Sequence, residues 1–187
     1  MDKFKVTIYI ETSFHGPAIR QAAGAWLIEY IKTNGDPETR QGVIKEDKTT
    51  ENALALELLK EALGKLTKPC SIRVNTQCEH ILNVMENHWL PQWEKNGWRN
   101  AKNKPVKNVE LWQQCQELMQ RHSISFSNVK NSYGNVMQAE IRKELESYRS
   151  LTEVQQIVDC VRAGHEMNVP YYDPEIDDDP YIVRPKW

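Results

Sequence analysis

The stretch 93–114, WEKNGWRNAKNKPVKNVELWQQ, decides how the rest of the chain is interpreted. From Lys95 to Lys107 it carries five cations and no acid, and a glycine and a proline interrupt it. We therefore predict an irregular basic loop, which has the charge to neutralise several phosphates. From Val109 apolar residues recur at helical spacing, so a helix over 109–121 is predicted to follow.

Working outward from this loop, the apolar pattern alternates between strand and helix periods. Strands are predicted at 6–10, 22–31, 40–45, 71–74 and 124–129, and the other helices at 49–65, 75–93, 136–148 and 151–163. A hairpin turn at Asn34-Gly35 makes the first three strands antiparallel, and the later strand–helix–strand units imply parallel pairing. The expected fold class is α/β, a five-stranded mixed sheet flanked by helices.

Composition is that of an ordinary globular protein, with 27% charged and 40% hydrophobic residues among 187. Length and pattern predict one domain over 1–148 and a C-terminal extension over 149–187, a helix followed by an acidic, Pro-rich tail. No apolar run approaches the roughly 20 residues of a membrane span, and no secretory leader is evident. Four scattered cysteines without a CxxC favour free thiols and a cytoplasmic location.

The 93–114 stretch closely resembles the basic protrusion and following helix of bacterial type 1 ribonuclease H. Shorter segments match at the corresponding places, namely IYIETS, TTENALALELLKEAL, IRVNTQ and ISFSNVKNSYGNV, so the resemblance covers about residues 4–148. It implies the ribonuclease H-like fold and a hydrolase in which carboxylates hold two Mg²⁺ or Mn²⁺ ions. Such an endonuclease cleaves the RNA strand of an RNA–DNA hybrid. Several converging carboxylates are needed to compensate the charge of two close dications.

The resemblance also shows that the catalytic positions have changed. Glu11 and Asn75 stand where the family has aspartates, and Ser132 stands where it has a loop histidine. The last aspartate aligns with Glu140, or with Ala139 after a one-residue slip. If a metal binds, Glu11, Asn75 and Glu140 are its expected ligands.

The glutamate of the first helix is also replaced, because its position aligns with Ala55. Glu51, one turn earlier and about 40° away around the helix, is a possible stand-in, although a first-turn acid also suits the helix dipole. Glu57 is the other nearby acid, about 200° from Ala55 on the polar face. With so many ligands altered, we expect a divergent member whose two-metal centre is degraded.

The binding positions, in contrast, are retained. Ten residues match family positions that contact nucleic acid or form the protrusion, namely Thr50, Asn52, Trp93, Lys95, Trp98, Arg99, Lys102, Lys104, Lys107 and Asn108. Asparagine and threonine suit the 2′-hydroxyl contacts by which a hybrid is distinguished. Trp112 is expected in the core instead. For the acids at Asp177–Asp179 three alternatives stay open: a cation site, a phosphate mimic against the basic loop, or a solvated tail.

Three hypotheses follow from these residues. In the first, the chain binds RNA–DNA hybrid or a related duplex, with nuclease activity weak or lost. In the second, a rearranged carboxylate site still cleaves the RNA strand with Mg²⁺ or Mn²⁺. In the third, the protein is structural and nucleic acid is irrelevant. The sequence sets no oligomeric state.

Overall fold

The computed structural model describes residues 4–162, without side chains at 148–153, 157, 160 and 161. The acidic tail predicted near Asp177 therefore lies outside the described residues. The chain divides into two compact units, Met1–Ser147 and Tyr148–Trp187.

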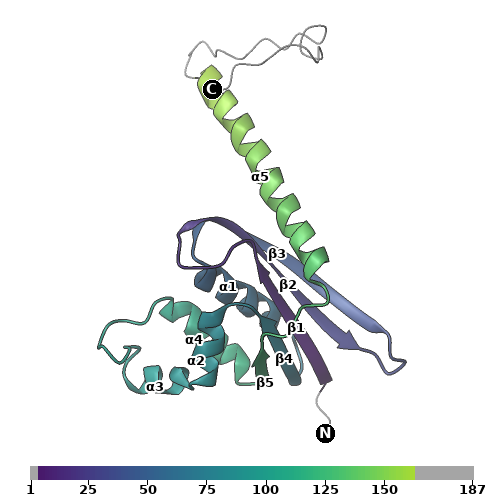
Figure 1. Cartoon of the computed structure of the whole chain (residues 1–187), viewed down its shortest axis with the longest axis vertical. Helices are drawn as coiled ribbons and strands as arrows, with labels where there is room; N and C mark the ends of the chain where they lie inside the picture. The colour runs from purple at the N-terminus through teal and green to yellow at the C-terminus, as the bar shows by residue number, and fades with distance from the viewer. Residues whose placement is uncertain (1–3, 163–187) are drawn as a thin grey trace. The chain divides into compact units, whose positions relative to one another are not determined.

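The first unit is built on a five-stranded mixed sheet with the order β3-β2-β1-β4-β5 (Figure 1). Its strands are β1 (Phe4–Thr12), β2 (Arg20–Ile31), β3 (Pro37–Thr49), β4 (Cys70–Thr76) and β5 (Ser123–Ser127). β1, β2 and β3 pair antiparallel, whereas β4 pairs parallel with both β1 and β5. The predicted ribonuclease H-like topology is thereby confirmed.

Five helices in the described residues accompany the sheet, and the sequence prediction differs from them in two places. They are α1 (Glu51–Gly64), α2 (Glu79–Glu86), α3 (Trp89–Lys95), α4 (Val109–Met119) and α5 (Gly134–Arg162). The helix predicted over 75–93 is wrong, because its first residues extend β4 and His88, with φ of 51°, ends the turn between α2 and α3. The two helices predicted over 136–163 are one, α5, because no glycine or proline separates them.

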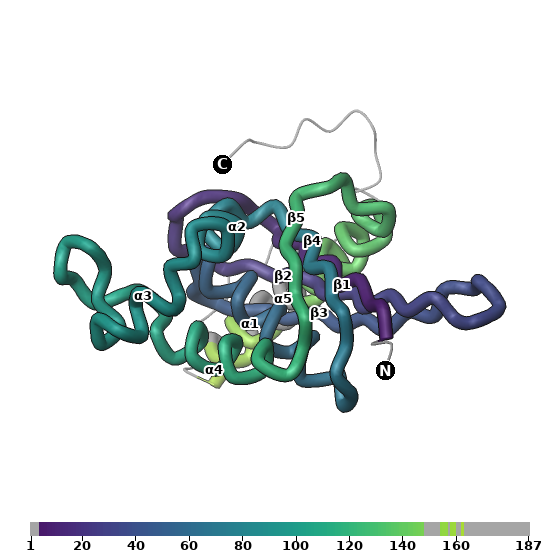
Figure 2. The backbone as a smooth tube through the Cα atoms, turned by 90° about the horizontal axis from the view of Figure 1, so that it is seen from below, coloured from purple at the N-terminus to yellow at the C-terminus, as the bar shows by residue number. Residues whose placement is uncertain are grey.

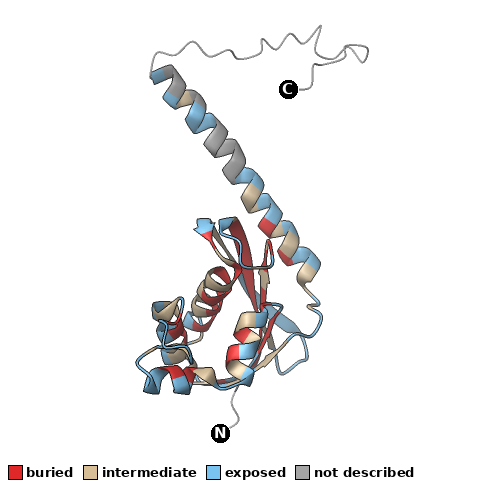
Figure 3. Cartoon of the chain, turned by 60° about the vertical axis from the view of Figure 1, so that its left-hand side comes forward, coloured by how far each residue is buried: buried red, intermediate tan, exposed pale blue. Residues whose placement is uncertain are grey.

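The core lies mainly on the α1 side of the sheet. Leu54, Leu58 and Leu63 of α1 are fully buried against the strands, and Trp112 of α4 is buried with them. Buried residues are red in Figure 3. On the other face, Met137 of α5 packs with small residues of β2. Because one face carries α1 and the other the start of α5, the strand ends between them hold the candidate site.

The register of the sheet brings two predicted site positions to neighbouring strands. β1 and β4 run parallel, with Tyr9 opposite Asn75, so Glu11 lies two residues beyond that pair at the carboxyl end of β1. Ligands gather at such ends in open α/β sheets. Among the described helices, none is long and apolar enough to cross a membrane.

Candidate functional site

Glu11 is held by two side-chain amides. Asn131, in the turn before α5, donates to one carboxylate oxygen at 2.8 Å. Gln138, on the first turns of α5, donates to the other at 3.1 Å and to the backbone carbonyl of Thr12 at 3.3 Å. Each oxygen of the carboxylate therefore has a neutral donor, and the arrangement ties β1 to α5 without a cation.

Glu51 is engaged in a different direction. One of its carboxylate oxygens lies 2.8 Å from His15 Nδ1, and the other accepts the backbone N–H of Gly16 at 2.7 Å. The side chain is buried and fastens the loop between β1 and β2 to the start of α1. Glu51, the possible stand-in for the helix glutamate, therefore has a structural role in this fold.

The remaining aligned positions do not form a cluster of acids. Ala55 is fully buried in α1 and has no carboxylate to offer. Asn75 is buried at the end of β4, and Ser132 is exposed in the turn before α5. Glu140 is two residues after Gln138, about 200° further around α5, so the residue that α5 presents to Glu11 is Gln138.

This donor set does not fit a two-metal centre. In the described part of the chain, no three His, Cys, Asp or Glu side chains gather where they could hold a metal ion. A pair of Mg²⁺ ions needs several anionic oxygens, but here the oxygens of Glu11 and Glu51 already accept hydrogen bonds from protein groups. The catalytic positions therefore differ from the family pattern in residue type, and the acids that remain there are bound to protein groups.

Sequence reasoning missed Asn131 and Gln138 because the ligands of the family are acids, whereas these two side chains are amides. A signal for Gln138 was present. Met137 and Ile141 are an apolar i, i+4 pair, which fixes the buried face of α5. Gln138 follows at the edge of that face.

The basic loop between α3 and α4 is ordered by hydrogen bonds within the loop. The side-chain carbonyl of Asn100 accepts the backbone N–H groups of Lys102 and Lys104, each at 3.0 Å. A bridge pairs Arg99 with Pro105, and the Arg99 guanidinium donates to the carbonyl of Asn103 at 2.9 Å. In Figure 2 the loop projects from the helical layer beyond α3. It therefore presents its charges from a defined conformation.

The cations of this loop form no ion pairs with the acids of the described residues. Lys95, Arg99, Lys102, Lys104 and Lys107 are all exposed, and across residues 4–162 none of them forms an ion pair with a carboxylate. Four of them, with Asn52 of α1 and His80 of α2, border a groove of about 600 Å³. The groove thus joins the polar start of α1 to the basic loop.

Some of the tryptophans line the groove, and others pack in or against the core. Trp93 is 8% exposed and lines the groove, with its ring 5.9 Å from those of Trp89 and Trp112. Trp98 is half-buried against the core with a positive φ of 60°. Trp112 is fully buried, which confirms its predicted place in the core.

His80 adds a titratable group to the groove. Its ring packs edge-on against Trp112 at 5.9 Å. Burial, with a smaller contribution from the Lys107 ammonium, lowers the pKa of this imidazole. The groove therefore has a neutral ring between its cations at neutral pH.

The other predicted binding residues shape helix starts. Thr50 caps α1 by accepting the N–H of Ala53 at 3.3 Å, and Asn108, with φ of 58°, precedes the first residue of α4. Both are partly exposed.

Known proteins resemble this chain in sequence and in fold. The sequence profile of the RNase H family matches residues 3–144. The chain belongs to the RNase H family. The ribonuclease H of Clostridium botulinum is 34% identical over 135 residues, which are 70% of this chain and 89% of that protein. The ribonuclease H of Dichelobacter nodosus is 45% identical over 87 residues, 46% of this chain and 57% of that protein.

Solved structures of RNase H folds are similar at low identity. LC9-RNase H1, described as a type 1 RNase H with the type 2 active-site motif, superposes with a TM-score of 0.61 at 22% identity. The match covers 76% of this chain and 71% of that one. A foamy viral protease-reverse transcriptase in complex with RNA/DNA hybrid gives 0.56 at 17% identity, over 75% and 20% of the chains. These likenesses establish the fold.

Proposed function

We propose that this RNase H family member binds RNA–DNA hybrid, or a related duplex, through the basic loop, and that its two-metal hydrolysis is weak or lost. The observation that carries the proposal is the groove that joins Asn52 to the unpaired cations of the basic loop. Cations in an ordered loop can neutralise successive phosphates. Asn52, which lines the same groove, supplies a sugar or base-edge contact in the minor groove of the bound duplex.

The second half of the proposal rests on the neighbours of Glu11. Assembling a metal pair there would require breaking two hydrogen bonds, from Asn131 and Gln138. No carboxylate stands at Ala55 to complete the ligand set. Binding without turnover is what remains when phosphate contacts are kept and charge compensation for the metals is missing.

The test compares a duplex of about 20 base pairs, roughly two helical turns, in three forms, RNA–DNA, DNA–DNA and RNA–RNA. Each form carries a fluorescent 5′ label and is titrated at several salt concentrations. We expect the hybrid to bind more tightly than DNA–DNA and its RNA strand to remain intact. Equal, salt-independent affinity for all three, or no binding, would contradict the proposal and favour a structural role.

A further inference from the structure

A second pocket lies far from the groove, at the opposite end of β1. It has a volume of about 300 Å³ between the start of β1, the end of β2 and the loop that follows α1. Val6, which lines it, is five residues before Glu11, or about 17 Å along the strand. The pocket therefore belongs to neither the carboxylate position nor the basic loop.

The floor of this pocket is apolar. Val6, Ile28 and Leu66 line it, with the rings of Phe4 and Tyr30 at one end. These two rings meet edge-on at 6.0 Å, and Phe4 remains 45% exposed. A partly exposed aromatic wall beside aliphatic side chains suits a small apolar body.

The rim of the pocket is positive. Arg40, Lys65 and Lys68 line it with a single acid, Glu38. Glu38 is already paired with Lys32 at 3.2 Å, and Lys65 lies 3.6 Å from Glu61. Arg40 and Lys68 form no ion pair with any acid within the described residues.

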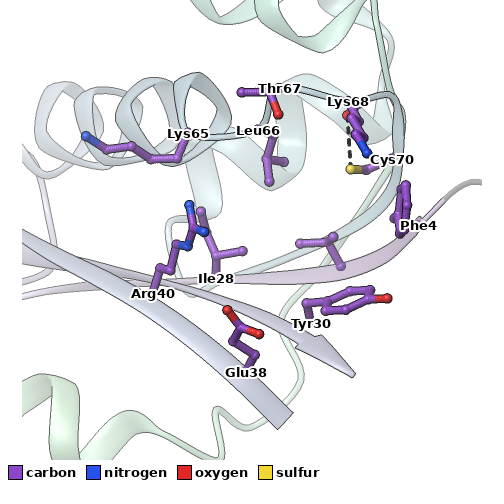
Figure 4. Close-up of a pocket in the computed structure, with 11 residues that line it drawn as sticks. Phe4, Ile28, Tyr30, Glu38, Arg40, Lys65, Leu66, Thr67, Lys68 and Cys70 are labelled. Atoms are coloured by element: carbon purple, nitrogen blue, oxygen red, sulfur yellow. Dashed lines mark hydrogen bonds between the residues drawn. The ribbon is translucent and has the colours of Figure 1, made fainter. Parts of the chain in front are cut away.

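The two unpaired cations approach the apolar floor from different elements. Figure 4 shows the Arg40 guanidinium pointing from β3 toward the loop after α1. Lys68 comes from that loop, with its ammonium 5.5 Å from the centre of the Phe4 ring. The thiol of Cys70 donates to the carbonyl of Lys68 at 3.1 Å, which holds this part of the loop in place.

We propose that this pocket binds a small amphipathic monocarboxylate. The carboxylate is bound by Arg40 at one end of the pocket, and the apolar body lies against Ile28 and Leu66 toward Phe4 and Lys68 at the other end (Figure 4). Charge complementarity selects the anion, because the two cations have no acid of their own. The volume, at the lower end of the range for ligand pockets, limits the body to a short alkyl chain or one ring. This site is independent of nucleic-acid binding.

The test uses the full chain and three probes of equal length, octanoate, octylamine and octanol, titrated while amide and methyl NMR signals are recorded. We expect saturable octanoate binding, with shifts confined to residues around Val6, Ile28 and Leu66. Octylamine and octanol are expected to bind more weakly. Equal or tighter binding of either one, or octanoate shifts spread over the whole surface, would overturn the proposal.

Two exposed variants test the cations separately. Arg40→Gln is expected to weaken octanoate binding by about tenfold, since a charge-assisted hydrogen bond contributes about that factor. Lys68→Gln is expected to weaken it less, because its ammonium lies at the other end of the pocket, beside Phe4. Lys48→Gln, an exposed position near the other end of β3, is the matched control and leaves octanoate affinity unchanged. Far-ultraviolet circular dichroism verifies that the variants fold. Unchanged octanoate affinity in both rim variants would refute the assignment.

Discussion

The side-chain amide of Gln138 on α5 donates a hydrogen bond of 3.1 Å to the carboxylate of Glu11 on β1. The relationship joins residues 127 positions apart and gives Glu11 a neutral partner where the RNase H family uses cations. The amide of Asn131 completes the arrangement on the second oxygen. Glu11 therefore contributes to holding α5 on the sheet.

The first prediction concerns that amide. Gln138→Glu places a second carboxylate beside Glu11, so like-charge repulsion replaces a hydrogen bond and lowers the free energy of unfolding by about 1–2 kcal/mol without metal. Millimolar-scale Mg²⁺ or Mn²⁺ is expected to restore part of this loss, because two adjacent carboxylates attract a dication. Thermal unfolding with and without metal measures both effects. Gln114→Glu, the same change at an exposed position of α4, is the control and shows neither.

A glycine beside Glu11 provides the second prediction. A Cβ on Gly24 would lie 2.5 Å from Leu58 Cδ1 and 2.9 Å from the backbone carbonyl of Glu11. Gly24→Ala is expected to lower the free energy of unfolding by about 1–3 kcal/mol, the usual cost of overpacking. Gly64→Ala, with no atom within 4 Å of the added methyl, is the control and is expected to be neutral or stabilising. Urea denaturation compares them, and equal midpoints would contradict the packing.

The third prediction addresses the basic loop. In the double variant Lys102→Glu, Lys104→Glu, hybrid affinity falls at every salt concentration, and the slope of log affinity against log salt becomes shallower by about 2, since each neutralised phosphate contributes about 0.9. Fluorescence anisotropy over a salt series measures the slope. Lys32→Glu, in the exposed turn after β2, is expected to leave the slope unchanged. An unaltered slope in the loop variant would remove the loop from the binding surface.

The fourth prediction is that acidification lowers the free energy of unfolding through protonation of His80. Burial and Lys107 lower its pKa, so the native state binds the proton less well than the unfolded chain. The resulting stabilisation is complete above about pH 6.5, the usual value for histidine, and is lost as the pH falls through the lowered pKa. The free energy of unfolding is expected to decrease from pH 7.5 to 5 more steeply in the wild type than in His80→Gln. Parallel curves from urea denaturation would count against this role.

Much of the fold could be predicted from local patterns. β1 alternates in period two and β2 is a continuous apolar run, Asn34-Gly35 marks the hairpin, and the leucines of α1 repeat at helical spacing. The break between α2 and α3 was not predictable, because His88 takes a positive φ without a glycine or proline to signal it. The continuity of α5 was also not predicted. The spacing of its apolar residues changes part-way along the helix, although the helical backbone continues from Gly134 to Arg162.

The candidate site was less predictable, because contacts between distant residues determine it. Motif spacing identified Glu11 and the basic loop. It gave no means of foreseeing that Glu51 bonds His15 and Gly16 rather than facing Glu11. It also favoured Glu140 by charge, whereas the direction of α5 brings Gln138 to the carboxylate. Side-chain direction on a helix depends on how the helix docks, which sequence spacing alone leaves open.

The most direct test is a single-turnover assay in which excess protein is mixed with hybrid labelled on the RNA strand, in chelator, Mg²⁺ or Mn²⁺. Binding is followed by anisotropy and the RNA strand is then resolved by length. We predict similar hybrid affinity in chelator and in metal, with an intact RNA strand. Efficient metal-dependent cleavage of the RNA strand that is abolished by Glu11→Ala would contradict the account.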